Sequence, residues 1–126
     1  MASSIRIDFS LFDTAQHPRE VTQLLGIKPD KEVGKGERNE KLSLPRQSIW
    51  SLMSSEGDMD VEHYWKEIYS KLGPVVEDVE AVSASATSRI TIIINVDGRL
   101  PSVIIPPSMS FFASKIGANI DIDYYE

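Results

Sequence analysis

Apolar and polar residues alternate with period two in several parts of the chain, and this alternation predicts strands that bury one face. The first such segment covers residues 5–12. The segment 89–97 repeats the pattern around a β-branched run, which favours a middle strand covered on both faces for part of its length. Residues 49–53 are dense in apolar side chains and are expected to lie inside the sheet.

Apolar residues spaced by three and four positions predict helices elsewhere. The clearest helix covers residues 61–72, with Asp60 as its N-cap, and apolar positions after residue 73 predict one or two further turns on the same side of the sheet. A shorter helix is expected over 18–25, where Pro18 pre-sets the first turn and a glycine follows the last apolar position.

The last third of the chain carries a stereochemical signal at each junction and predicts a β-β-α-β unit. Its parts are a strand at 89–97, a turn at Asp97-Gly98, a strand at 100–105, a helix at 107–116 and a closing strand at 119–125. The whole order predicts one α+β domain over residues 1–126. We expect a two-layer sandwich with a mixed or antiparallel sheet and helices on one face, related to the ferredoxin-like arrangement.

Composition limits the classes of function. The chain has 126 residues, 41% of them hydrophobic and 25% charged, as expected for an ordinary globular domain. The absence of cysteine excludes disulfides, thiolate catalysis and cysteine-ligated metals. No leader pattern is visible and no apolar segment approaches the ~20 residues of a membrane span, so we expect a cytoplasmic protein.

Charge is placed unevenly. The net charge of -6 argues against a nucleic-acid partner, whose phosphates require a cationic surface. Residues 54–80 carry eight acids against two bases, whereas residues 28–46 carry six bases against four acids. The acidic stretch suits a basic protein partner, although a solvated acidic helix face is the commoner role of such a stretch. The candidate contact residues are Asp58, Asp60, Glu62 and Glu67.

The segment between residues 28 and 48 shows little periodicity and predicts either short edge strands or a loop. Long irregular segments in compact domains are often functional. Its basic residues, together with the tryptophan that follows, give an alternative hypothesis of a binding site for an anionic metabolite. That site would use Lys35, Arg38, Arg46 and Trp50. Trp50 fits the core better than a contact role, because it lies within an apolar strand.

Catalytic and metal-binding signatures are missing from the sequence. His17 and His63 each lack a second ligand at metal spacing, and residues 34–36 lack the rest of a phosphate-loop motif. Three outward carboxylates would form a cluster if the first and last strands were neighbours. These are Asp8, Asp121 and Asp123. We therefore expect no catalytic residue, metal or cofactor, and exposed edge strands would allow a homodimer.

Five segments, in this order and spacing, resemble an uncharacterised and mainly bacterial family, domain of unknown function 4279. The segments are residues 5–12, 21–29, 34–37, 49–52 and 120–124. The resemblance covers nearly the whole chain and implies a single small cytoplasmic α+β domain without an established activity, so no residue roles are carried over. Small acidic bacterial domains of this size are sometimes immunity proteins. Our leading hypothesis is a non-enzymatic binding protein, immunity-type or regulatory, for a basic protein partner.

Overall fold

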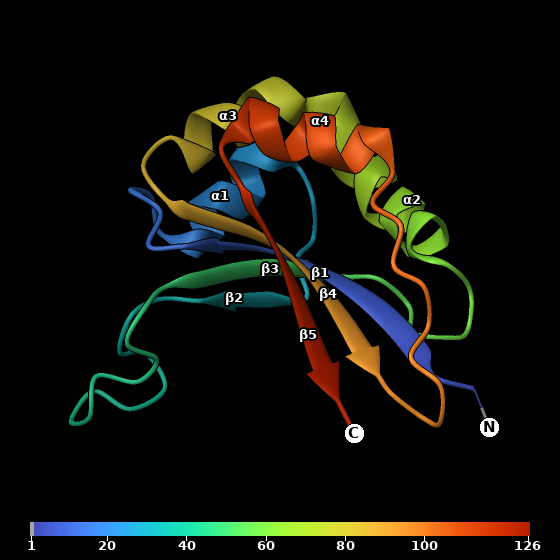
Figure 1. The fold of residues 1–126 in the computed structure, drawn as a ribbon. Helices are drawn as coiled ribbons and strands as arrows, with labels where there is room; N and C mark the ends of the chain where they lie inside the picture. Colours follow the sequence, from blue (N-terminus) through green and yellow to red (C-terminus); the bar gives the residue numbers. More distant parts are fainter. Residues whose placement is uncertain (1) are drawn as a thin grey trace.

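The computed structural model describes residues 2–126, in which a five-stranded sheet carries all the helices on one face (Figure 1). The elements are, in chain order, β1 (Ser4–Phe12), α1 (Pro18–Leu25), β2 (Lys31–Val33), β3 (Ile49–Met53), α2 (Val61–Leu72), the 3-10 helix η1 (Gly73–Val75), α3 (Val76–Ser83), β4 (Thr87–Asn95), α4 (Pro107–Ile116) and β5 (Asn119–Tyr125). The predicted α+β class and mixed sheet are confirmed. The relation to the ferredoxin-like arrangement stays a prediction.

The strand order is β2-β3-β1-β4-β5, with β1 in the centre. Strands β3 and β4 both pair with β1 in antiparallel fashion, and β5 pairs with β4 in parallel. The predicted interior positions of β3 and β4 are therefore confirmed. Because two parallel neighbours cannot be joined by a tight hairpin, the chain returns from β4 to β5 through residues 96–106 and α4.

The strand predicted over residues 100–105 is wrong, because the structure forms no strand there. The alternation that suggested it is nevertheless real: Val103 and Ile105 pack against the core, whereas Ile104 is 75% exposed. The predicted turn at Asp97-Gly98 would pair this strand with β4, but both edges of β4 are occupied, by β1 and β5. The segment is therefore extended and half-buried without a hydrogen-bonded partner strand.

Residues 28–48 contain both of the structures that the sequence left open. Strand β2 is a three-residue edge strand, and residues 34–48 form a loop that projects from the body of the molecule (Figure 1). We call residues 34–48 the arm. Backbone hydrogen bonds close the arm on itself, from Gly36 N to Pro45 O (2.9 Å) and from Leu44 N to Asn39 O (2.9 Å).

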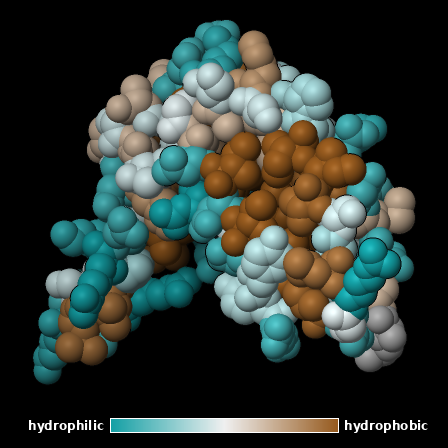
Figure 2. All heavy atoms as spheres, in the orientation of Figure 1, coloured by the Kyte–Doolittle hydropathy of each residue, from teal (hydrophilic) through white to brown (hydrophobic). Residues whose placement is uncertain are grey.

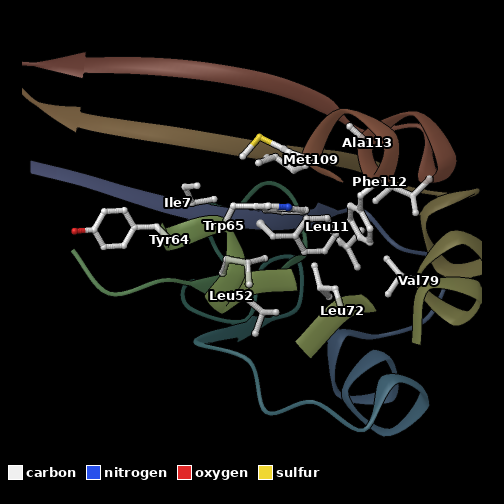
Figure 3. Packing of buried hydrophobic residues seen from close by; sticks show 14 of the residues in the cluster. Ile7, Leu11, Leu52, Tyr64, Trp65, Leu72, Val79, Met109, Phe112 and Ala113 are labelled. Atoms are coloured by element: carbon white, nitrogen blue, oxygen red, sulfur yellow. The ribbon is translucent and has the colours of Figure 1, made fainter. Parts of the chain in front are cut away.

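The core lies between the sheet and the helices and gathers aromatic side chains around Trp65 (Figure 3). Trp65 is almost fully buried, stacks on Tyr69 and meets the ring of Phe112 edge-on. Its indole N–H donates to Ser108 Oγ at 2.7 Å, which satisfies the buried donor and ties α2 to α4. The start of α2 is thus fixed relative to the chain that leads into α4.

Candidate functional site: an acidic hollow beside helix α2

The first turn of α2 directs carboxylates outward from an apolar anchor. Asp60 is the predicted N-cap, and its Oδ1 accepts a hydrogen bond from the backbone N–H of His63 at 2.9 Å. Val61 follows and is buried, so the next residue, Glu62, faces solvent. Acidic groups are favourable at this end of a helix because the first-turn N–H groups carry a partial positive charge.

The opposite wall comes from the extended segment before α4. Because Val103 and Ile105 turn toward the core, the side chain of Ile104 points outward. Pro106 and Pro107 follow, and Pro107 opens α4 at a position where its missing N–H costs nothing. This wall is largely apolar, because Ile104, Pro106 and Pro107 form most of it.

Between the two walls lies a hollow of about 310 Å³, which we call the acidic hollow. It is lined by Asp60, Val61, Glu62, Ser102, Ile104, Pro106 and Pro107. Two acidic residues border the side of α2, and three apolar residues with one serine border the other side. A lysine or arginine side chain matches this combination, because it carries an apolar stem and a cationic head.

The four predicted contact acids differ in exposure and in the partners that their carboxylates already have. Glu62 forms an exposed ion pair with Lys66 at 3.8 Å, and such pairs contribute little. Asp58 is also exposed. The carboxylate of Glu67, by contrast, is held by Ser55, whose Oγ and N–H donate to it at 2.6 and 2.9 Å. These two hydrogen bonds are the main cause that lowers the pKa of Glu67 below its usual value.

The structure therefore brings two of the four acids together and sets one apart. Asp60 and Glu62 line the same hollow. Glu67 lies five positions after Glu62, about 140° further around the helix, and anchors the loop after β3 instead. The wall formed by Ile104 was missed by sequence reasoning, because the segment 100–105 was predicted to be a strand.

The residues of the alternative site do not converge. Trp50 is fully buried, and its indole N–H donates to Thr22 Oγ1 at 3.0 Å, so this side chain belongs to the core. Lys35 lines a shallow hollow of about 270 Å³ near the start of α1. A second hollow lies on the arm and is lined by Lys35, Gly36, Glu37, Glu40 and Ser43. Arg38 and Arg46 also lie on the arm, but they line neither hollow.

The start of α1 offers little to an anion. His17 Nδ1 accepts from Arg19 N at 3.0 Å, and the N–H groups of Glu20 and Val21 both donate to the carbonyl of His17. The other ring nitrogen of His17 contacts the carboxylate of Glu37, and this hydrogen bond is the main cause that lowers the pKa of Glu37. The backbone N–H groups of residues 19–21 therefore already have acceptors, and the carboxylate of Glu37 lies where an anion would approach the start of α1.

Asp121 and Asp123 share the open face of β5, but Asp8 does not join them, because β4 lies between β1 and β5. Asp8 and Asp121 lie in one row across the sheet, but Thr91 of β4 separates them. Asp8 is instead bound by the guanidinium of Arg6, at 2.9 Å from its Nε. Within residues 2–126, no three histidine, aspartate or glutamate side chains are arranged to hold a metal ion.

The fold and the hollow define a small α+β domain with a mixed acidic and apolar surface site. The family model described as domain of unknown function (DUF4279) matches residues 3–126, and the chain belongs to this family. No curated protein and no solved structure matched the chain. Among the residues that the structure describes, no helix combines the length and apolarity needed to cross a membrane.

Proposed function

We propose that this domain is a cytoplasmic, non-enzymatic binding protein that takes a basic protein partner at the acidic hollow. The observation that supports the proposal is the juxtaposition of the Asp60 and Glu62 carboxylates with the apolar wall of Ile104, Pro106 and Pro107. Protein interfaces commonly combine an apolar centre with a polar rim. An immunity-type or regulatory role fits a small domain whose task is to occupy a basic surface on another protein.

The chemistry of the hollow sets which side chain it selects. An arginine or lysine stem replaces water against Ile104, and the cationic head meets the two carboxylates at the rim. Opposite charge also steers the approach, so complementary charges raise the association rate and the specificity more than the affinity. The net charge of -6 acts in the same direction at long range.

The test selects peptides from a random displayed library on the purified domain and measures the binding of the enriched peptides by fluorescence anisotropy. We expect enriched peptides with arginine or lysine beside an apolar residue. The double substitution Asp60→Asn with Glu62→Gln should weaken their binding at least tenfold and flatten its salt dependence. Asparagine still caps a helix, so the start of α2 is kept.

A matched control also removes two negative charges, one from the first turn of α1 and one from the first turn of α3, with Glu20→Gln and Asp78→Asn. This control should leave binding within about twofold. Enriched peptides without basic residues, or equal losses in both double variants, would contradict the proposal. A rise in melting temperature with anionic metabolites, lost on replacing Lys35, Arg38 and Arg46 by glutamine, would instead support the small-ligand alternative.

A further inference from the structure

Strand β5 leaves a long, regular edge of the sheet open. Among residues 2–126 it pairs only with β4, and its register with β4 is continuous over seven residues, from Asn119 to Tyr125. Natural proteins usually protect sheet edges with short strands, lysine, proline or a bulge. The other edge follows this rule, because β2 has three residues and begins with Lys31. Strand β5 has neither lysine nor proline.

The hydrogen bonds at the end of β5 fix which backbone groups face outward. Val96 N donates to Tyr125 O at 2.6 Å, so the peptide groups of Tyr125 face β4. Backbone direction alternates along a strand. Asp121 and Asp123 therefore also bond toward β4, whereas Ile120, Ile122 and Tyr124 present their N–H and C=O groups to the open edge.

The side chains along this edge form two rows of different chemistry. On the helix side, Ile122 is 36% and Tyr124 51% exposed. Figure 2 shows an apolar area on this side of the molecule, next to β5 and the segment 96–106. A hollow of about 310 Å³ between Leu100 and Tyr124 continues this row. On the open face of the sheet, the row consists of Asn119, Asp121, Asp123 and Tyr125, with the two acids in its middle.

Charge decides which strand would fit this edge. In an antiparallel pairing of two copies centred on Ile122, Asp121 of each copy would lie directly opposite Asp123 of the other. Like charges at directly opposed positions destabilise a strand pair. A docked strand with lysine or arginine opposite Asp121 and Asp123 would instead be attracted at both positions. An apolar residue between these two positions would contact Ile122 and Tyr124.

We infer that β5 is a docking edge for an extended protein segment in which basic and apolar residues alternate, added to the sheet as a sixth strand. In this mode of recognition, main-chain hydrogen bonds hold the segment and the alternating side chains select it. The basic residues of the segment lie over Asp121 and Asp123, and its apolar residues lie beside Ile122 and Tyr124. This edge is separate from the acidic hollow, and either surface could bind without the other.

The experiment uses the whole domain, labelled with ¹⁵N, and a seven-residue capped peptide of alternating lysine and valine. In the free protein, we expect fast amide exchange at Ile120, Ile122 and Tyr124 and slow exchange at Asp121 and Asp123. Adding the peptide should slow exchange at the three outward amides at least tenfold. A peptide of alternating glutamate and valine should bind at least tenfold more weakly.

Two variants test the two contributions separately. Ile122→Pro removes an outward N–H and no hydrogen bond to β4, so it should fold and lose the peptide. Asp121→Lys with Asp123→Lys should reverse the preference to the glutamate peptide, and this variant tests the inference even if the proline variant does not fold. The control Glu20→Lys with Asp78→Lys should bind the lysine peptide as the parent does.

Three results would overturn the inference. The first is slow exchange at the three outward amides without peptide, as a β5-to-β5 dimer would produce. The second is peptide-induced shifts that map away from β5. The third is equal binding of the two peptides by the parent domain.

Discussion

Glu67→Gln tests whether this acid holds the fold together rather than binding a partner. The two carboxylate oxygens of Glu67 accept from the N–H and the hydroxyl of Ser55, at 2.9 and 2.6 Å. Glutamine has nearly the same shape, but it offers one acceptor instead of two and carries no charge. The substitution therefore weakens the link between α2 and the loop after β3 without opening a cavity.

The expected loss of stability follows from the exposure of this pair of hydrogen bonds. A hydrogen bond to a charged group contributes about 1.5–3 kcal/mol when it is well buried. The Glu67 side chain is 40% exposed, so solvent screens it, and glutamine keeps one of the two contacts. We expect a decrease of about 1 kcal/mol in the free energy of unfolding at pH 7.

The sign of the pH dependence follows from the lowered pKa of Glu67 in the folded state. The unfolded chain takes up this proton at a higher pH than the native protein does, so acidification favours unfolding. The contribution of Glu67 should be fully present above the unfolded value of about 4.3 and should vanish as the pH falls through the folded pKa.

Urea unfolding, followed by fluorescence of the two buried tryptophans, measures the free energy at pH 7, 5, 4 and 3. Glu62→Gln is the control, since its pair with Lys66 is exposed and should change stability by less than about 0.5 kcal/mol. The reasoning fails if the two variants are equally stable at pH 7, or if the difference between Glu67→Gln and the parent is as large at pH 3 as at pH 7.

Three further substitutions test a close contact, a buried hydrogen bond and a pair of surface ion pairs. In Gly57→Ala, the new Cβ would lie 2.6 Å from the hydroxyl of the buried Tyr64, and we expect a loss of about 1–3 kcal/mol in urea unfolding. The buried hydroxyl of Ser83 donates to the carbonyl of Ile116 at 2.7 Å, so Ser83→Ala should cost about 1–3 kcal/mol by the same assay. Lys115→Met removes ion pairs that join α4 to α3 at the surface, and its melting temperature should change by no more than a few degrees and depend less on salt.

Local signals predicted most of the elements. The period-two segments at 5–12 and 49–53 became β1 and β3, and the helical spacing after Asp60 became α2 with its predicted cap. Gly26 and Gly117 follow their helices in the left-handed conformation, with φ of 67° and 77°. In each case the signal lies within a few residues of the structure that it specifies.

The candidate site was predicted only in part, because half of it depends on topology. The sequence identified Asp60 and Glu62 as acids at the start of an exposed helix. It gave no indication that Ile104 would lie across from them, since that requires knowing that β5 pairs with β4 in parallel. The same alternation around Ile104 fits a strand in a sheet and an unpaired extended segment equally well.

The parallel pairing of β4 and β5 accounts for both proposed surfaces. It forces the segment 96–106 to cross the helix side of the sheet, where Figure 1 shows it running between the start of α2 and β5. One end of this crossing supplies Ile104 to the acidic hollow, and the other supplies Leu100 to the apolar row beside β5. An antiparallel hairpin after β4 would have removed the crossing and placed the last strand beside β4 without either hollow. The binding surfaces thus follow from the direction of one strand, and no short sequence motif encodes them.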